Sequence, residues 1–255
     1  MSLLALPDRW LAPAPAPERV GWLRGRIFAH RGLHGPGVPE NSPAAFSAAI
    51  QRGFGIECDV RKAFDGQPVV FHDADLDRLT AERGPLAERT AEQLGRIRLS
   101  GGQDTIPTLR ETLDRVAGKV PLLIEVKSDR GHRVEALCLA VRRVLEGYRG
   151  DHAVMSFDPR VSRWFRRHSP LTVRGLVMSE ENEKALAGRI KRHLNLWLAR
   201  PDFLAYDIRD LPGRFPGSQR RRGLPLATWT VRSPELLARA LDHADAPTVE
   251  GAGVP

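Results

Sequence analysis

The chain has few cysteines, few lysines and no long apolar run. Its two cysteines, Cys58 and Cys138, cannot build a disulfide framework, so we expect a protein of the reducing cytoplasm. No apolar stretch reaches the ~20 residues that a membrane-spanning helix needs. Pro7, Asp8 and Arg9 interrupt the one N-terminal stretch that could serve as a signal peptide core. We therefore expect neither a stable membrane anchor nor a secretion signal.

Basic residues outnumber acidic ones, and nearly all of them are arginine. The chain holds 39 Lys and Arg against 31 Asp and Glu, a net charge of +8, with lysine only at positions 62, 119, 127, 184 and 191. Such an excess attracts anions, including nucleic acid and anionic lipid. The run Arg220-Arg221-Arg222 nevertheless favours a solvated helix end over a nucleic-acid patch. We expect no nucleic-acid partner, with a non-catalytic nucleic-acid-binding protein as the alternative.

Short apolar runs alternate with segments of helical periodicity, which predicts an α/β fold with a parallel sheet. Strands are expected at 27–31, 55–60, 121–127, 153–157, 172–178, 203–208, 225–231 and 246–250. Helices are expected at 109–117, 133–145, 159–167, 184–198 and 234–241. Eight strands predict a single-domain TIM (β/α)8 barrel, provided that Val69–His72 forms a hairpin with the second strand through Asp65-Gly66. Residues 75–105 would then be an excursion over the catalytic rim.

The first residues have a different composition. Ala-Pro repeats at 12–17 predict a semi-rigid N-terminal arm over residues 1–24, followed by the barrel over 25–255.

Five short polar signatures lie in the first half of the chain, four of them just after an apolar run. They are His30-Arg31-Gly32, Glu40-Asn41, Glu57-Cys58-Asp59, His72-Asp73 and Glu125-Val126-Lys127. Because the carboxyl ends of parallel strands meet at one rim, we expect these side chains to line one cavity.

Strand alternation predicts which of these side chains share a face. Glu57 and Asp59 point to one side while Cys58 points away, and Glu125 pairs with Lys127 in the same way. Three clustered carboxylates repel one another unless a cation lies between them. Oxygen ligands without cysteine or paired histidine favour Mg²⁺ or Ca²⁺, so we predict that Glu57, Asp59 and Glu125 hold a divalent metal ion.

The order of these motifs resembles the glycerophosphodiester phosphodiesterase family. The motifs that carry the resemblance are H-R-G, E-N-S, E-C-D-V, V-V-F-H-D with L-D-R-L-T, I-P-T-L and I-E-V-K, over about Phe28 to Lys127. The second half is similar more loosely, at 155–157, 174–176 and 227–231. The C-terminus departs from the family, which usually shows an apolar strand, a Thr-Asp or similar pair and a Pro where this chain reads E-G-A-G-V-P from Glu250 to Pro255. Glu250 would stand in for the usual acidic or polar residue, and the eighth strand's contribution to the pocket is in doubt.

The resemblance implies that His30 and His72 are the general acid and base, in an order that the sequence leaves open. It also implies that Arg31 and Lys127 bind phosphate, with the three carboxylates on the metal. Trp229 matches an aromatic of the substrate pocket, against an ordinary core tryptophan as the alternative. Possible supporting residues are Glu40, Asn41, Ser156 and Phe157. Asn41 or Ser42, with Pro43, could equally be a simple helix start.

We therefore expect metal-dependent hydrolysis of a small-molecule phosphodiester to glycerol 3-phosphate and an alcohol. In-line displacement at phosphorus needs a base, an acid and positive charge on the equatorial oxygens, and these residue types supply all three. Two alternatives remain at this point: a lysophospholipase D or phospholipase acting on acyl-bearing phosphodiesters, and a degenerate barrel that only binds them. The sequence does not predict the oligomeric state.

Overall fold

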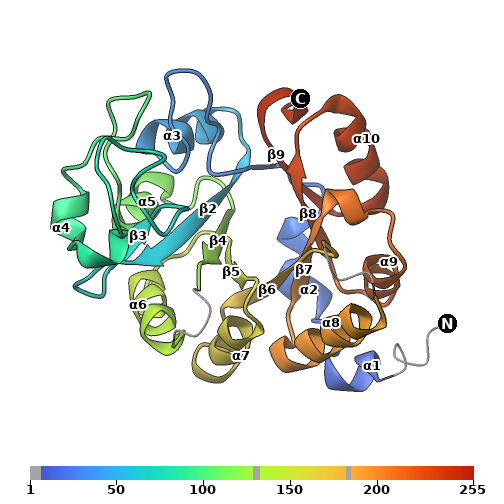
Figure 1. The fold of residues 1–255 in the computed structure, drawn as a ribbon. Helices are drawn as coiled ribbons and strands as arrows, with labels where there is room; N and C mark the ends of the chain where they lie inside the picture. The colour runs from blue at the N-terminus through green and yellow to red at the C-terminus, as the bar shows by residue number, and fades with distance from the viewer. Residues whose placement is uncertain (1–6, 129–132, 182–184) are drawn as a thin grey trace. The chain divides into compact units, whose positions relative to one another are not determined.

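The computed structural model describes residues 7–128, 133–181 and 185–255. The chain divides into two compact units, one of residues 28–152 and one of residues 1–27 with 153–255. Each unit contains parallel strands flanked by helices (Figure 1).

The strands of the first unit lie around the long strand β2. Their bounds are β1 Phe28–Ala29, β2 Gly55–Lys62, β3 Pro68–Val70 and β4 Leu122–Val126. β2 pairs in parallel with β1 and β4, and antiparallel with β3. Gly66 adopts φ 84° in the turn between β2 and β3, a left-handed conformation that glycine tolerates without strain. The predicted hairpin at Asp65-Gly66 is present.

Side-chain caps begin three helices of this unit. Its helices are α3 Pro43–Gln51, η3 Leu86–Glu88, α4 Ala91–Leu94, α5 Leu109–Val116 and α6 Glu135–Leu145. The Ser42 hydroxyl accepts from the Ala45 N–H, with Pro43 at the first helical position. Thr108 and Glu111 form a reciprocal capping box at the start of α5.

The excursion over residues 75–105 has a small apolar core of its own. Its side chains pack with residues of the β2–β3 hairpin and of the segment that leads into α5. The cluster contains Ala63, Val69, Phe71, Leu76, Leu86, Ala91, Leu94, Leu99 and Ile106. This packing gives the segment that follows β3 a defined path, which positions several residues of the site described below.

The second unit has five parallel strands, each paired with the next along the chain from β5 to β9. They are β5 His152–Ser156, β6 Val173–Met178, β7 Phe203–Asp207, β8 Leu226–Val231 and β9 Ala246–Val249. The helices are α1 Asp8–Leu11, α2 Pro17–Val20, η2 Gly21–Leu23, α7 Pro159–His168, α8 Leu186–Ala199, η4 Ile208–Asp210, α9 Arg214–Arg221, α10 Pro234–His243 and η5 Gly251–Gly253.

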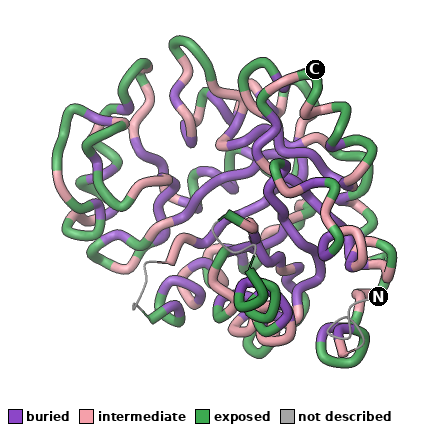
Figure 2. Tube along the Cα trace, turned by 45° about the vertical axis from the view of Figure 1, so that its right-hand side comes forward, coloured by how far each residue is buried: buried purple, intermediate pink, exposed green. Residues whose placement is uncertain are grey.

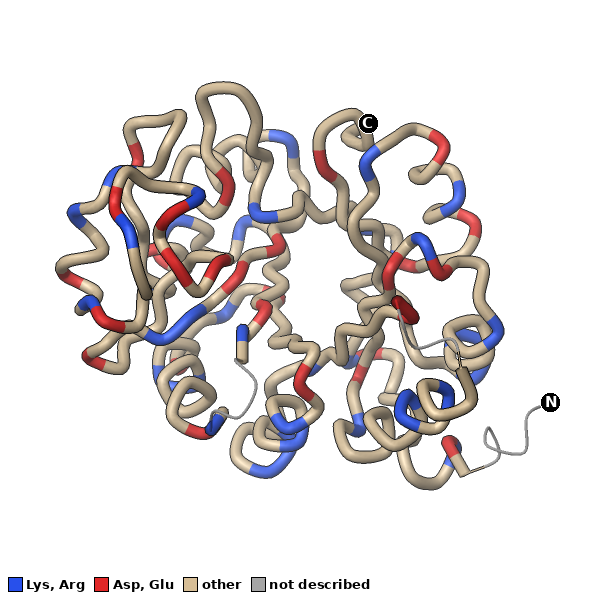
Figure 3. The backbone as a smooth tube through the Cα atoms, in the orientation of Figure 1, with Lys and Arg blue, Asp and Glu red and all other residues tan. Residues whose placement is uncertain are grey.

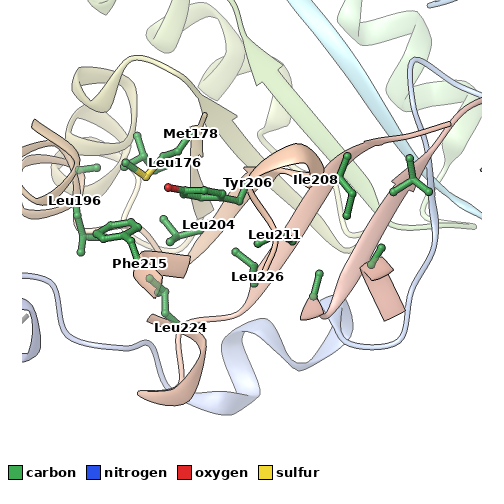
Figure 4. Packing of buried hydrophobic residues seen from close by; sticks show 14 of the residues in the cluster. Leu176, Met178, Leu196, Leu204, Tyr206, Ile208, Leu211, Phe215, Leu224 and Leu226 are labelled. Carbon is green, nitrogen blue, oxygen red and sulfur yellow. The ribbon is translucent and has the colours of Figure 1, made fainter. Parts of the chain in front are cut away.

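The core of this unit joins its strands to α8, α9 and α10. Leu204 and Tyr206 of β7 pack with Leu226 of β8, Leu196 of α8 and Phe215 of α9 (Figure 4). The strands are buried along most of their length, whereas the exposed residues gather on helices and loops (Figure 2). Near-continuous apolar strands of this kind are typical of parallel sheets covered by helices.

In the described residues, eight parallel strands and the antiparallel β3 alternate with helices, which confirms the predicted TIM (β/α)8 barrel with a hairpin after its second strand. The predicted helices are present with bounds shifted by one or two residues; Lys184, the expected first residue of one of them, lies outside the described residues. α9 ends within the arginine run that we interpreted as a helix end. None of the helices described has the length and apolar character needed to cross a membrane.

The N-terminal segment contains short helices that pack within the second unit. Asp8 of α1 is fully buried and accepts hydrogen bonds from His193, Trp197 and Gln219 at 2.9, 2.7 and 2.6 Å. Residues 1–6 lie outside the described residues. The division into an arm over 1–24 and a barrel over 25–255 stays a prediction.

Candidate active site

The His30-Arg31-Gly32 motif follows β1 and turns sharply. Arg31 adopts φ 55°, and its backbone N–H donates to Glu57 Oε2 at 3.1 Å. Gly32 has φ 78°, and a Cβ there would lie 2.7 Å from the Cβ of Ala45. Only glycine fits this close approach to α3. The motif is therefore a turn that brings two polar side chains against the carboxylates of β2.

Three buried carboxylates converge within the first unit. Glu57 and Asp59 lie two residues apart on β2 and share a face, and the register pairs Asp59 with Glu125 of β4. One oxygen from each carboxylate lies within 4.8 Å of one from each of the others. All three side chains are buried, as the sequence interpretation requires for a common cavity.

Lys127 neutralises two of these carboxylates. Its Nζ lies 2.8 Å from Asp59 Oδ1 and 2.7 Å from Glu125 Oε1. Burial alone would lower the pKa of Lys127, but the neighbouring Glu125 and Asp59 outweigh it and raise that pKa. The ammonium therefore stays charged. Burial likewise opposes ionisation of Asp59, yet Lys127 and Arg31 hold its pKa below the usual value.

Glu57 lacks comparable compensation. Burial, followed by the negative charges of Asp59 and Glu125, raises the pKa of Glu57 well above its ordinary value. A cation held by the three carboxylates would remove this cost, since it would add positive charge at the position where the protein supplies too little. The buried all-oxygen donor set suits a hard divalent ion such as Mg²⁺ or Ca²⁺. The residues present fit a metal ion.

Arg31 and Asn41 hold the carboxylate group in place. Arg31 Nη1 donates to Glu40 Oε1 at 2.8 Å, and Arg31 Nε lies 3.2 Å from Asp59 Oδ2. Asn41, also left-handed at φ 55°, donates from Nδ2 to Asp59 Oδ2 at 2.9 Å and accepts from the Asp59 N–H at 3.3 Å. Asn41 thus makes side-chain contacts within the site, while Ser42 is the residue that caps α3.

His72 is held in place by one contact to its ring and one to its backbone. Its Nδ1 lies 2.6 Å from Asp73 Oδ1, and Arg61 Nε donates to its carbonyl oxygen at 2.7 Å. A proton on Nδ1 shared with Asp73 leaves Nε2 for exchange with a substrate. Burial lowers the pKa of His72, with Lys127 and Arg31 adding to the effect against the opposing charge of Asp59. His72 is therefore neutral at neutral pH.

Arg78 is a site residue to which the sequence interpretation gave no role. Its guanidinium donates to both oxygens of Asp73, at 2.5 and 3.1 Å, and to both oxygens of Glu40, at 3.1 and 2.8 Å. It joins the partner of His72 to the partner of Arg31. Although burial opposes ionisation of Asp73, hydrogen bonds from Arg78 and His72 lower its pKa to about 2. The sequence contains Arg78 in the L-D-R-L-T motif, shortly after the H-D motif. It does not show how residues 75–105 fold, so it could not predict that Arg78 reaches Asp73 and Glu40.

His30 lies near Glu57, with its Nε2 4.0 Å from Glu57 Oε2, and its side chain is buried. Glu57 thus lies next to two residues of the first motif: it accepts from the Arg31 N–H and neighbours the His30 imidazole. Charged groups of both signs alternate along the segments of the first unit that carry these residues (Figure 3).

The aromatic residues predicted for the pocket lie in the second unit. Trp229 of β8 is partly exposed, donates from Nε1 to the Ala205 carbonyl at 3.1 Å, and contacts Phe157 edge to face at 5.4 Å between ring centroids. Ser156 is buried at the end of β5, and its hydroxyl accepts from the Asp158 N–H. Phe157 is 48% exposed, which leaves an apolar edge available to a ligand. Their part in substrate binding stays a prediction.

Comparisons with known proteins agree with these motifs. The model of the glycerophosphoryl diester phosphodiesterase family matches residues 30–254. A glycerophosphodiester phosphodiesterase of Bacillus altitudinis is 38% identical over 109 residues, which cover 40% of this chain and 44% of that protein. YhdW of Bacillus subtilis is 29% identical over 223 residues, covering 84% of this chain and 88% of its own.

A solved structure shares the fold over most of its length. The phosphodiesterase of Oleispira antarctica in complex with its product sn-glycerol 3-phosphate has a TM-score of 0.75 and 24% identity, covering 89% of this chain and 93% of that one. Both the motif order and the fold therefore agree with the family match. The chain belongs to the glycerophosphoryl diester phosphodiesterase family.

Proposed function

We propose that the protein is a metal-dependent hydrolase that cleaves glycerophosphodiesters to glycerol 3-phosphate and an alcohol such as choline or ethanolamine. The observation that carries the proposal is the convergence of Glu57, Asp59 and Glu125 within 4.8 Å, buried and incompletely neutralised. The family membership and the product named for the Oleispira antarctica relative support the choice of substrate.

In this proposal the three carboxylates hold Mg²⁺ or Ca²⁺. A divalent ion bound there supplies positive charge to the phosphoryl oxygens in the transition state. Arg31 and Lys127 supply further positive charge to the phosphate, while their ion pairs with Asp59, Glu40 and Glu125 fix where that charge lies. The donors are therefore organised before the substrate binds.

The two histidines transfer the protons. Neutral His72, held by Asp73 through Nδ1, accepts on Nε2 the proton of the water molecule that attacks phosphorus. His30 donates a proton to the departing alkoxide. Asp73 and Arg78 act through His72 as positioning residues, since Asp73 contacts its ring and Arg78 holds Asp73. The partly exposed Trp229 and Phe157 supply an apolar edge for the glycerol or alcohol moiety.

The substrate is a small molecule and the site is a single-metal hydrolytic centre. We also propose a cytoplasmic location, since Cys58 and Cys138 are both buried and neither forms a disulfide. Burial raises the pKa of Cys58 well above its usual value, so this thiol next to the carboxylates is chemically inert.

The test is release of glycerol 3-phosphate from glycerophosphocholine and glycerophosphoethanolamine by purified protein, with Mg²⁺, with Ca²⁺ and with EDTA. Release that needs the metal and stops with EDTA is the expected result. An acyl-bearing lysophosphatidylcholine is assayed in parallel. Faster turnover of that lipid than of the deacylated substrates would move the assignment to a lysophospholipase D. No release under any condition would leave a barrel that only binds phosphodiesters.

A further inference from the structure

Positive charge without negative charge is concentrated on one part of the second unit, formed by residues 159–172 and 185–200, hereafter the α7–α8 face. The helices α7 and α8 pack against each other in this face. The two segments contain eight Lys and Arg residues and no Asp or Glu. Their net charge of +8 equals the net charge of the entire chain. Basic residues recur along both helices (Figure 3).

Five arginine side chains of this face have no carboxylate within ion-pair distance among the described residues. They are Arg163, Arg166, Arg167, Arg189 and Arg200. Arg166 additionally has a buried Nε without any hydrogen-bond partner. Burial and the nearby charges of Arg200, Arg167 and Arg163 lower its pKa, so these guanidinium groups lie close enough to disfavour one another. An anion bound among them would relieve that repulsion.

Acidic residues near the face already have cationic partners. Two of these partners belong to the face itself, since Arg192 binds Glu180 and Arg160 lies 2.7 Å from Asp158. Asp202 binds Arg19 Nε at 3.0 Å and Arg174 Nη1 at 3.2 Å. Glu180 binds Arg192 at 3.2 Å and accepts from the Tyr206 hydroxyl at 2.8 Å. Among the described residues, these carboxylates therefore leave the other five arginines of the face without an ion-pair partner.

Exposed apolar side chains lie on the same face. Six of the nine large apolar residues exposed in the described chain belong to the α7–α8 face or to α1, which packs against α8. Leu186, Ile190 and Leu194 repeat every four residues along α8 and are 64%, 40% and 53% exposed. This spacing forms a stripe on a helix, flanked by Arg189 and Lys191. Apolar residues that cluster in this way mark an interaction surface.

Leu171 is the most exposed of these residues, at 89%. Arg19 Nη2 donates to the carbonyl oxygens of Pro170 and Thr172, each at 2.8 Å, on either side of it. The two bonds fix the backbone on both sides of this exposed leucine, in the segment that follows α7. An outward leucine held by the protein loses little conformational freedom when it enters an apolar phase.

We propose that the α7–α8 face docks the protein reversibly on the surface of an anionic phospholipid bilayer. Charge complementarity identifies the partner: the arginines would contact lipid phosphates while Leu171 and the α8 stripe insert between the head groups. A nucleic acid would match the charge but leave the aliphatic residues in water. This docking is peripheral, and it is independent of the proposed hydrolysis.

The test is cosedimentation of the full chain with vesicles of phosphatidylcholine alone and of phosphatidylcholine with about one third phosphatidylglycerol. We expect binding only to the anionic vesicles, weakening as salt is raised. Arg166→Gln with Arg167→Gln should weaken it about 25-fold, since each basic residue near such a surface is worth about fivefold. Leu171→Ser should weaken it about tenfold.

The matched control is Arg239→Gln with Leu241→Ser on α10, where both residues are exposed but Glu235 and Asp242 lie on the same helix. This control should bind as the wild type does. Leu171→Ser is on an exposed loop, so it keeps the test valid if the arginine variant fails to fold. Turnover of soluble glycerophosphocholine should be unchanged in every variant.

Five results would overturn the proposal, the first four of them in the vesicle and oligonucleotide assays. These four are equal binding to both kinds of vesicle, equal loss in the α10 control, unaltered binding in the α7 and Leu171 variants, and arginine-dependent binding of a single-stranded oligonucleotide without vesicle binding. Self-association in the absence of vesicles that Leu171→Ser abolishes would likewise overturn it, since the face would then bind a second copy of the chain.

Discussion

Arg31, Arg78 and Lys127 of the candidate active site bind carboxylates, whereas most basic residues of the α7–α8 face bind none among the residues that the structure describes. Arg31, Arg78 and Lys127 each contact two carboxylates. Arg163 and Arg167 contact none among the described residues. The same residue type therefore serves two purposes: paired with carboxylates, it fixes the geometry of other groups; without a carboxylate partner, it presents a field that attracts anions.

The difference follows from the cost of burial. A buried charge without a partner is costly, so charges near β2 and β4 persist only as a connected network. On the surface, an unpaired guanidinium stays hydrated and costs little. A substitution near the strands should consequently act on catalysis, and one on the α7–α8 face should act on association.

The largest effect is expected from the histidines. His72→Ala and His30→Ala should each lower kcat by about 10²–10⁴-fold, since each removes a proton transfer. Glycerol 3-phosphate release measures the loss, and circular dichroism checks that the variants are folded. His168→Ala, on α7, is the matched control and should keep wild-type turnover. Turnover within a few-fold of the parent in either variant would contradict the proposed roles.

The next effect is expected from Arg78, which tests whether paired cations act through geometry. Arg78→Gln removes the bridge from Asp73 to Glu40 and should lower kcat by up to about 100-fold, because His72 and Arg31 lose their fixed positions. KM should change less.

Arg83→Gln is the control for this experiment, since Arg83 is highly exposed and lies 3.4 Å from Asp77 in the same excursion. A loss in KM with an unchanged kcat would show that Arg78 serves substrate binding instead.

A smaller effect is expected on stability, from Asp8, the carboxylate that binds His193 and Trp197 of α8. Asp8→Asn should lower the free energy of unfolding by about 1–3 kcal/mol, because it weakens a buried hydrogen-bond network with His193, Trp197 and Gln219. Burial raises the pKa of Asp8, but the hydrogen bonds outweigh it and hold that pKa below its usual value.

The sign of the pH dependence follows from this shift. A carboxyl whose pKa is lowered by folding stabilises the protein above its unfolded pKa and loses that contribution as the pH falls through its folded pKa. Chemical denaturation at several pH values should therefore show the gap between wild type and Asp8→Asn narrowing below about pH 4. A gap that widens on acidification would contradict the assignment.

The smallest effect is expected from single exposed arginines. Arg167→Gln should change the free energy of unfolding by no more than about 0.5 kcal/mol, in the stabilising direction at low salt, because it relieves repulsion among the arginines of α7. Arg220→Gln, in the same unit, should destabilise by more, because Arg220 binds Asp245 and two carbonyl groups. Thermal unfolding at low and high salt distinguishes the two. Equal changes in the free energy of unfolding for Arg167→Gln and Arg220→Gln would contradict the proposed difference between paired and unpaired arginines.

The sequence by itself determined the fold class and the identity of the polar motifs. Apolar runs of strand length alternate with helical periodicity, and this pattern is local enough to read residue by residue. Alternation along β2 likewise placed Glu57 and Asp59 on one face, because neighbouring strand residues must point in opposite directions.

Only the tertiary structure decided which of these groups bind one another. The bridge of Arg78 between Asp73 and Glu40 depends on the path of residues 75–105, which their small apolar core fixes and no local pattern encodes. The composition shows that basic residues are in excess. It does not show that they gather on the α7–α8 face, because that clustering arises from the packing of two helices that lie apart in the sequence. Contacts between distant segments set both results, since side-chain pairing depends on three-dimensional proximity and not on position along the chain.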